Sequence, residues 1–225
     1  MSYSVVIPAY NASETLVETL DSVFAQTIPP GEVLLINDGS NDRTLEIATA
    51  YSKSLVIVSQ TNQGCGKATS VGIQLAKYPI IATVDADDIW LPHKMKRQLA
   101  HLQANQEISI LCSQLRLFHH NNHNRDGGSV KDGYGRSTLV IRRTVYDLIG
   151  EIIDPPGNRG DLVDWLARCR EHGLIIGLLP EILCLRRIIP GSLSYGRNKE
   201  LDRGYLDVAR RAILRKKLNQ GKGTL

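Results

Sequence analysis

The sequence predicts an α/β domain in which a mostly parallel central sheet is flanked by helices. In the first half of the chain, short apolar segments rich in β-branched residues alternate with longer segments of helical periodicity. This alternation is typical of a parallel sheet with helices on both faces. The chain has 225 residues, of which 42% are hydrophobic, so it can bury one sizeable core in a single domain.

The expected elements follow one another in a regular order. Asn11 is expected to cap the first helix, with Glu14 three residues later in a capping-box arrangement. The alternation weakens later in the chain, where a loop at 155–160 is expected to precede a helix over 161–172. Strands are expected at 3–8, 32–37, 55–58, 80–85, 108–118, 138–142, 174–179 and 182–186, and the other helices at 12–26, 42–53, 67–77 and 92–105.

Three aspartates, Asp85, Asp87 and Asp88, lie where the fourth strand should end. So much negative charge within four positions is unfavourable unless a positive charge lies among it. Mg²⁺ and Mn²⁺ prefer carboxylate oxygens and often bridge to phosphates, so a divalent cation is the expected partner. Alternation along an extended chain places Asp85 and Asp87 on one side and Asp88 on the other. The alternative interpretation is a solvated acidic turn before the helix that Pro92 begins.

Polar loops follow two other expected strands. One strand ends in Pro8-Ala9-Tyr10-Asn11 and the other in Asp38-Gly39-Ser40. In open sheets of this kind, ligands bind beyond the carboxyl ends of the strands. These two loops and Asp85-Ala86-Asp87 are therefore expected to form a single nucleotide site.

A glycine-containing stretch, Gly64-Cys65-Gly66-Lys67, leads into the third helix. Glycines let a backbone approach a ligand closely and a helix N-terminus suits a phosphate group, so Gly66 and Lys67 are candidate ligand-binding residues. The stretch does not match a Walker loop, and the start of the chain lacks the dinucleotide-binding G-x-G-x-x-G pattern. A plain helix cap is the alternative interpretation.

Together with Trp90-Leu91-Pro92, these motifs resemble those of the family 2 glycosyltransferases of the GT-A fold, in the same order and at the same spacing. The resemblance extends from about residue 4 to about residue 194. It implies transfer of a sugar from a nucleoside-diphosphate sugar, such as a UDP-sugar, to an acceptor hydroxyl by an inverting single displacement. It also implies that residues 1–106 bind the donor and residues 107–195 the acceptor, followed by a basic helix at 196–225.

The same resemblance assigns roles to individual residues. Pro8 to Tyr10 would flank the nucleotide base, while Asp38 and Asp85 would contact the base and the ribose. Asp87 would hold Mg²⁺ or Mn²⁺, which would stabilise the leaving diphosphate as a Lewis acid. An acidic side chain at the start of the helix over 161–172 would remove the proton from the acceptor hydroxyl.

Two departures from the family pattern concern acidic residues. Asn37 stands where the first Asp of an Asp-Asp-Gly-Ser motif is usual. The catalytic Glu-Asp pair is also incomplete, because one alignment pairs Asp161 with Leu162 and the alignment shifted by one pairs Gly160 with Asp161. Asp164 lies one turn further along the same helix face.

The catalytic base is therefore expected to be Asp161 or Asp164. Asp161 is preferred, because the start of a helix points into the cleft. In the alternative interpretation, Asp161 is only a helix N-cap and Asp164 is a solvated residue. A third departure is Ile189, which replaces a metal-reaching His before Pro-Gly-Ser, so the ion would rest on Asp87, phosphate oxygens and water.

The composition of the chain indicates where the protein is located and how its cysteines and charges are distributed. No apolar run reaches the length of a membrane span and the N-terminus lacks a signal pattern, so a cytoplasmic location is expected. The four scattered cysteines form no C-x-x-C pair, and reduced, mostly buried thiols are expected. Nine Lys and Arg but only three acidic residues lie within 197–222, so this tail carries a net charge of +6, while the whole chain carries +4.

The tail has two interpretations. An apolar stripe recurs there at helical spacing, which predicts a terminal helix packed on the domain with a solvated basic face. The alternative is peripheral attachment to the anionic inner face of a membrane. The stripe consists of Leu201, Tyr205, Val208 and Ala212.

Three functions compete with sugar transfer. A catalytically silent family member that serves as a binding or scaffold protein is favoured by Ile189 and the incomplete acidic pair. A nucleotidyltransferase would carry a glycine-rich loop with a basic residue after the first strand, where this chain has Pro8-Ala9-Tyr10-Asn11. Binding of nucleic acid is not expected, because no aromatic platform or recognition motif accompanies the basic tail.

Overall fold

The computed structural model describes residues 1–122, 125–190, 192, 195–196, 199–200 and 202–221. Its strands are β1 (Tyr3–Ala9), β2 (Glu32–Asp38), β3 (Val56–Gln60), β4 (Ile80–Thr83), β5 (Ile89–Trp90), β6 (Ile108–His119), β7 (Val130–Gly133), β8 (Val140–Arg142) and β9 (Ile175–Ile188). Its helices are α1 (Leu16–Phe24), α2 (Thr44–Ala50), α3 (Cys65–Leu75), α4 (Lys94–Ala104), α5 (Arg143–Ile149), α6 (Asp161–Glu171) and α7 (Arg203–Gly221), with a short 3₁₀ helix, η1, at Arg136–Thr138.

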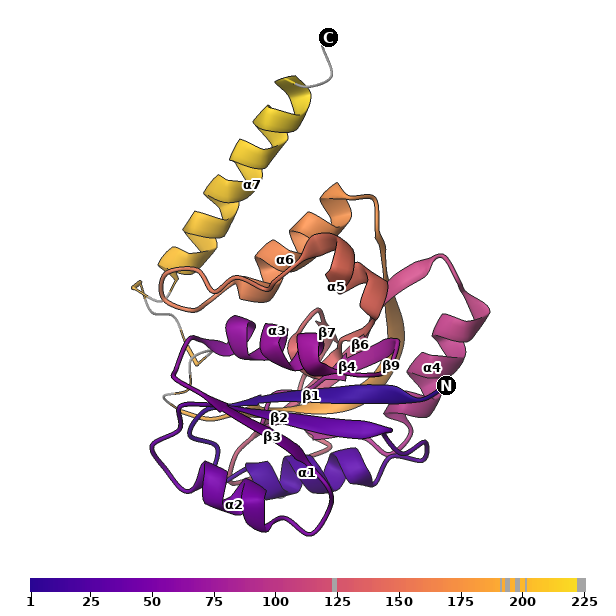
Figure 1. Ribbon diagram of the computed structural model, residues 1–225, viewed down its shortest axis with the longest axis vertical. Helices are drawn as coiled ribbons and strands as arrows, with labels where there is room; N and C mark the ends of the chain where they lie inside the picture. The colour runs from indigo at the N-terminus through magenta and orange to yellow at the C-terminus, as the bar shows by residue number, and fades with distance from the viewer. Residues whose placement is uncertain (123–124, 191, 193–194, 197–198, 201, 222–225) are drawn as a thin grey trace.

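The strands of the described residues join in one mixed sheet, in the order β3-β2-β1-β4-β8-β6-β9-β5, with β7 paired to β6 (Figure 1). The first four strands in this order are mutually parallel, and β6 runs parallel to β9 along most of its length. The pairs β4–β8, β6–β8, β6–β7 and β5–β9 are antiparallel. Most of the paired residues thus belong to parallel ladders, which confirms the predicted α/β class and its mostly parallel sheet.

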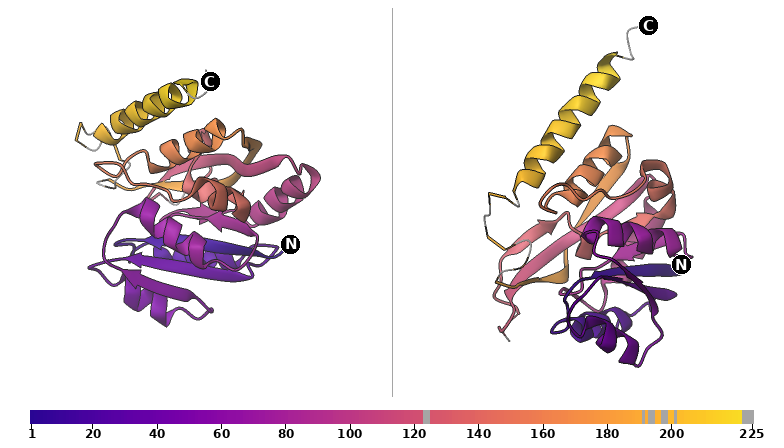
Figure 2. Two further views of the ribbon diagram at one scale, coloured as in Figure 1. Left: turned by 45° about the horizontal axis from the view of Figure 1, so that its top comes forward. Right: turned by 60° about the vertical axis from the view of Figure 1, so that its left-hand side comes forward.

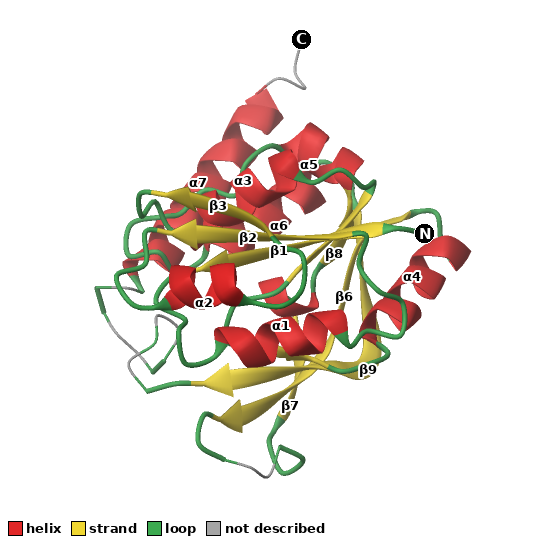
Figure 3. Cartoon of the chain, turned by 60° about the horizontal axis from the view of Figure 1, so that its bottom comes forward, coloured by secondary structure: helices red, strands yellow, loops and turns green. Residues whose placement is uncertain are grey.

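Helices cover both faces of the sheet, as Figure 3 shows for α1 and α2 on one side and α3 on the other. In β1, Val5 and Ile7 pack in the core that contains α1 and α4, whereas Val6 packs in the core beneath α3 and α6. A strand buried on both faces must be apolar at nearly every position, which explains the continuous apolar run at the start of the chain.

The first helix begins later than the sequence indicated, and its predicted capping box is wrong. Asn11 has a positive φ of 49°, and α1 starts only at Leu16. The Asn11 side chain instead accepts a hydrogen bond of 2.8 Å from the backbone N–H of Asn41. Asn11 therefore ties the loop after β1 to the loop after β2, and this contact brings two of the expected ligand-binding loops together.

The two strands expected at 174–179 and 182–186 form one long strand, β9. Its pairing with β6 shifts register between Leu179 and Ile182. Pro180 lies in this interval and has no N–H to donate to a ladder, so the strand continues past it through an irregularity. The elements β5, β7, η1 and α5 are short and were not expected from the sequence.

One charged side chain lies wholly inside the core. Lys94 is fully buried, and its Nζ lies 4.0 Å from the centre of the Trp90 ring and 3.8 Å from the Met95 Sδ. Burial lowers the pKa of Lys94 to about 7, although the neighbouring thiols of Cys184 and Cys112 act in the opposite direction. The cation–π contact with Trp90 is the favourable interaction that accompanies this burial.

We expect Lys94→Met to change how stability depends on pH. Because the folded-state pKa of about 7 lies below the ordinary value of about 10.4, the unfolded chain binds more protons between these pH values. The free-energy cost of burying Lys94 is therefore fully present below pH 7. This cost disappears as the pH rises toward 10. Urea denaturation should show a gain in stability for Lys94→Met that is largest at pH 7 and smallest at pH 10.

The matched control is Lys96→Met, which removes an exposed lysine from the same helix. Its difference from wild type should not vary between these pH values. A constant difference for Lys94→Met as well would show that the buried amine does not change its protonation on unfolding.

Candidate functional site

A cavity of about 1090 Å³ opens at the carboxyl ends of β1, β2 and β4. This volume slightly exceeds the roughly 300–1,000 Å³ of typical small-molecule sites. It is therefore large enough to hold a small-molecule ligand. The predicted site residues that line it are Pro8, Ala9, Tyr10, Asn11, Asp38, Asp85, Ala86, Asp87 and Asp161.

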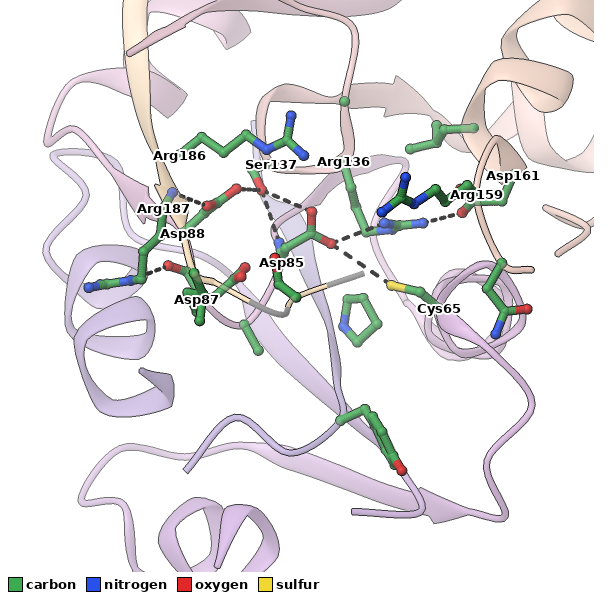
Figure 4. A pocket seen from close by; sticks show the side chains of 18 of the residues that line it. Cys65, Asp85, Asp87, Asp88, Arg136, Ser137, Arg159, Asp161, Arg186 and Arg187 are labelled. Atoms are coloured by element: carbon green, nitrogen blue, oxygen red, sulfur yellow. Dashed lines mark hydrogen bonds and ion pairs between the residues drawn. The ribbon is translucent and has the colours of Figure 1, made fainter. Parts of the chain in front are cut away.

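One buried cation joins the two sides of this cavity. Arg136, from η1, is 8% exposed and donates from Nη1 to Asp85 Oδ1 at 3.0 Å and from Nη2 to Asp161 Oδ2 (Figure 4). Its Nε donates to the Thr69 hydroxyl on α3 at 2.8 Å. A guanidinium is always charged and presents its donors in a fixed fork, so it holds both carboxylates in defined positions.

The neighbouring aspartate, Asp88, is buried and bound by other parts of the protein. It is 2% exposed; its Oδ1 accepts the backbone N–H of Arg187 at 2.8 Å, and its Oδ2 accepts the Ser137 hydroxyl. Burial, followed by the charges of Asp87 and Asp85, raises the pKa of Asp88 well above its ordinary value. Asp88 thus joins β9 and η1 to the end of the acidic motif, and both of its carboxylate oxygens accept hydrogen bonds from the protein.

Asp87 differs from Asp85 and Asp88 in the hydrogen bonds that its carboxylate receives. It lines the cavity, and none of the described side chains donates a hydrogen bond to its carboxylate. Burial and then the charge of Asp85 raise the pKa of Asp87 to about 6, while Arg186 and Arg187 oppose this rise. Asp87 therefore fits a cation, although within the described chain no group of three metal-ligating side chains could hold one by itself.

Asp38 lines the cavity and also holds the segment 60–64 in place. Its carboxylate accepts hydrogen bonds from the backbone N–H groups of Gln63 and Gly64, each at 2.9 Å, and from the Gln60 side chain at 2.7 Å. The adjacent Asn37 donates to the Ser59 hydroxyl and accepts from the Ser40 backbone N–H. Asn37 therefore links β2 to β3 and to the loop that follows β2.

Gly66 and Lys67, the other predicted ligand-binding residues, are not among the residues that line this cavity. The backbone N–H groups of both residues donate to the Asp154 carboxylate, at 2.9 and 2.8 Å. Lys67 Nζ pairs with Glu151 at 2.7 Å. The N-terminus of α3 is an anion site, as predicted, but the anion that it binds is a side chain of the same chain.

Asp164, the second candidate base, lies away from the cavity. It is 2% exposed and pairs with Arg168 on its own helix at 3.1 Å and with Arg215 of α7 at 2.9 Å. Asp161, one turn earlier, does face the cavity, as the sequence indicated. Gly160, which precedes it, has a φ of 102°, and a Cβ there would lie 3.1 Å from the Tyr205 ring, so a Glu at this position would be strained.

Sequence analysis missed several residues of the site. Arg136, Ser137 and Arg187 hold the acidic motif, and Cys65 lies with its Sγ 3.9 Å from Asp85 Oδ1. Burial raises the pKa of the Cys65 thiol well above its ordinary value, so the thiol stays protonated beside the carboxylate. The acidic cluster did signal a nearby positive charge, but nothing in the local pattern identified an arginine 51 residues away.

Ile189 also lines the cavity, so the position of the expected metal-reaching His is part of the site but has no metal-binding atom. Gly191 of the Pro-Gly-Ser motif lies outside the described residues. Arg186 and Lys131 line the cavity too, and unlike Arg136 they form no ion pair within the described part of the chain. Both cations thus face the same cavity as Asp87.

The model of the family described as glycosyl transferase family 2 matches residues 4–155, more than half of the chain. The chain belongs to glycosyl transferase family 2. WfgD of Escherichia coli, a UDP-Glc:alpha-D-GlcNAc-diphosphoundecaprenol beta-1,3-glucosyltransferase, is 26% identical over 214 residues, which cover 89% of this chain and 82% of WfgD. An uncharacterized glycosyltransferase of Rickettsia prowazekii, RP339, is 33% identical over 111 residues, which cover 48% of this chain and 35% of RP339. The match thus spans about a third of the length of this relative.

Solved structures give the same fold. TarS 1-349 of S. aureus in complex with UDP-GlcNAc matches with a TM-score of 0.75 and 20% identity, covering 95% of this chain and 66% of TarS. The same protein in complex with UDP matches with a TM-score of 0.67 and 19% identity, covering 84% of this chain and 61% of TarS. At this identity the similarity establishes the architecture, and it confirms the predicted GT-A fold.

We expect Arg136→Met to destabilise the site and the fold together. The variant keeps a long apolar side chain but leaves Asp85 and Asp161 without their shared cation. Removal of one partner from a buried ion pair costs about 3–5 kcal/mol, because an uncompensated charge remains. Urea denaturation measures this cost, and Arg97→Met is the matched control because it breaks an exposed pair with Glu181. The control should cost much less, because water screens an exposed ion pair; equal costs would contradict a central role for Arg136.

Proposed function

We propose that this chain is a glycosyltransferase that moves a sugar from a nucleoside-diphosphate sugar to an acceptor hydroxyl. The observation that carries the proposal is a single cavity that gathers three strand-end motifs and faces Asp161 across them. The donor-binding motifs come from β1, β2 and β4, and the proposed base comes from the start of α6. Such an arrangement suits a reaction in which two substrates meet between the halves 1–106 and 107–195.

A UDP-sugar is the proposed donor. The TarS structures contain UDP and UDP-GlcNAc, and WfgD is named for UDP-Glc. The loop after β1, with Pro8 to Tyr10, would flank the uracil, while Asp38 and Asp85 would contact the base and the ribose. Asp38 already accepts three hydrogen bonds from its own chain, so its contribution to the nucleotide would come from the remaining acceptor capacity of the carboxylate.

Asp87 is the residue that would hold Mg²⁺ or Mn²⁺. Its open carboxylate supports this role, and the donor diphosphate and water would supply the other oxygen ligands. The bound ion would neutralise charge that develops on the leaving diphosphate. Arg186 would act on the same charge from β9, because its guanidinium lines the cavity without an ion-pair partner among the described residues.

Asp161 is the proposed base. Arg136 binds one carboxylate oxygen, Oδ2, and fixes the orientation of the group, which leaves Oδ1 for the acceptor. In an inverting displacement, the acceptor oxygen forms a bond to the anomeric carbon as the bond to the diphosphate breaks, and the acceptor proton passes to Asp161. This step needs no covalent intermediate and no second carboxylate, which agrees with the absence of Glu at position 160.

A silent binding protein is the second candidate. The ion pair of Asp161 with Arg136 and the apolar Ile189 favour it, because both reduce the groups available for chemistry. The two candidates differ in turnover and not in donor binding. UDP release from UDP-glucose and UDP-GlcNAc, with a panel of acceptor sugars and Mn²⁺, therefore tests the proposed activity directly.

We expect Asp87→Asn to abolish the part of UDP binding that depends on Mn²⁺. The amide keeps the size of the side chain but lacks the negative charge that attracts a divalent cation. Calorimetric titration of UDP with and without Mn²⁺ measures the difference, and Asp147→Asn, at an exposed position outside the cavity, is the control. If wild type bound UDP equally well with and without Mn²⁺, Asp87 would have no metal role.

We expect Asp161→Asn to lower transfer by about 100-fold or more, the usual scale for loss of general-base catalysis, with donor binding near that of wild type. Asp164→Asn should instead lower the melting temperature, because it weakens two buried ion pairs, and should retain most of its transfer activity per folded molecule. The reverse order of activity losses would move the catalytic role to Asp164. No turnover by wild type would favour the silent binding protein.

A further inference from the structure

The last helix, α7, extends away from the domain (Figure 2). One side of it is anchored: Val208 is buried, and Arg215 pairs with Asp164 and Glu171 of α6. Of the stripe predicted to pack on the domain, Tyr205 is half exposed, and Leu201 lies outside the described residues. The anchoring therefore uses one buried apolar side chain and ion pairs, and most of the helix surface remains open.

The open side of α7 carries large apolar side chains. A rotation of 100° per residue places Leu206, Ile213 and Leu214 on the side opposite Val208, with Leu218 at its margin. Their exposed fractions are 62%, 57%, 59% and 67%. Single exposed apolar residues are ordinary on a protein surface, but four large ones along one helix, two on each flank of its open side, indicate a contact.

Free basic side chains lie among these apolar ones. The same rotation places Arg203, Arg210 and Lys217 at the middle of the open side, between the two apolar flanks, with Lys216 at its margin. None of these four forms an ion pair within the described part of the chain, whereas Arg211 pairs with Asp207 and Arg215 with α6. We define the outer face of α7 as these eight residues: Arg203, Leu206, Arg210, Ile213, Leu214, Lys216, Lys217 and Leu218.

We propose that the outer face of α7 docks on an anionic lipid bilayer. Apolar side chains enter the boundary between headgroups and acyl chains, while Lys and Arg extend to the anionic headgroups on flexible stems. Charge selects this partner: a second copy of the helix would place Arg210 and Lys217 against equally basic residues. No helix in the described ranges is long and apolar enough to cross a membrane, so α7 lies on the surface of the bilayer.

The position of α7 gives this contact a consequence for the cavity. Tyr205, in its first turn, lines the cavity, and its ring lies beside Gly160, next to Asp161. Docking through the outer face therefore holds the acceptor side of the cavity close to the membrane surface. For an enzyme with the proposed function, such a position suits an acceptor sugar carried on a lipid. The lipid-linked acceptor rests on the proposed function, whereas the docking on a bilayer does not.

Co-sedimentation of the full chain with vesicles tests the docking. The probes are vesicles of phosphatidylcholine alone and of phosphatidylcholine mixed with phosphatidylglycerol. Binding is expected only to the anionic vesicles and is expected to be lost in 1 M salt, where the Debye length falls to about 3 Å. Equal binding to both vesicle types, or no binding to either, would overturn the proposal.

Two variants separate the contributions of charge and apolar contact. One replaces Arg203, Arg210, Lys216 and Lys217 with Gln, and the other replaces Leu206, Ile213, Leu214 and Leu218 with Ser; each should weaken vesicle binding at least tenfold. The charge-matched control replaces Lys53, Lys77, Lys96 and Arg97 with Gln, at exposed positions elsewhere on the domain. A control that binds as weakly as the α7 charge variant would overturn the proposal, since net charge alone would then explain binding.

Two further measurements test whether unfolding or dimer formation explains the loss of vesicle binding by the variants. Unchanged melting temperatures of the variants show that the domain is folded while binding is lost. Analytical ultracentrifugation detects the competing outcome, a dimer of wild type that the Leu-to-Ser variant abolishes, and such a dimer without vesicle binding would overturn the proposal. Vesicle binding by a chain that does not bind UDP would refute the proposed function and leave the docking intact.

Discussion

The Arg136 guanidinium is the interaction on which the candidate site depends. Two carboxylates, Asp85 at the end of β4 and Asp161 at the start of α6, approach the same point from opposite sides of the cavity. Without a cation between them they would repel each other in surroundings that water screens poorly. Arg136 resolves this conflict and also binds Thr69 on α3, so one side chain fixes the relative positions of three elements.

The position of Arg136 follows from the topology of the sheet. Because β8 is antiparallel to β4 and adjacent to it, η1, which precedes β8, must lie at the edge of the sheet where β4 ends. Ser137 of the same 3₁₀ helix binds Asp88, and its carbonyl accepts the Trp90 indole N–H at 2.7 Å. The acidic motif is therefore held by the segment that joins the two halves of the sheet, and the proposed donor site in the first half requires the second half to be folded.

Four aspartates of this structure have different environments. Asp154 occupies the N-terminus of α3, Asp88 is a buried acceptor, and Asp164 anchors α7 through Arg215. Asp87, in contrast, presents a carboxylate to the cavity that none of the described side chains neutralises directly. What separates these residues is the set of donors and cations that surround each one, and that set depends on which other segments pack beside it.

The sequence by itself determined the α/β class, the parallel order of the first half and the meeting of three strand-end motifs, because periodicity and strand polarity are local properties of the chain. The choice of Asp161 as the cavity-facing residue also followed from a local rule, namely that the first residues of a helix in such a fold point into the cleft. Only the tertiary structure decided that Arg136 is the partner of Asp85, that Asp154 fills the anion site at Gly66 and Lys67, and that Asp164 faces away from the cavity. These outcomes join residues that are far apart in the chain, and the pairing of distant charges depends on the packing of the elements that carry them.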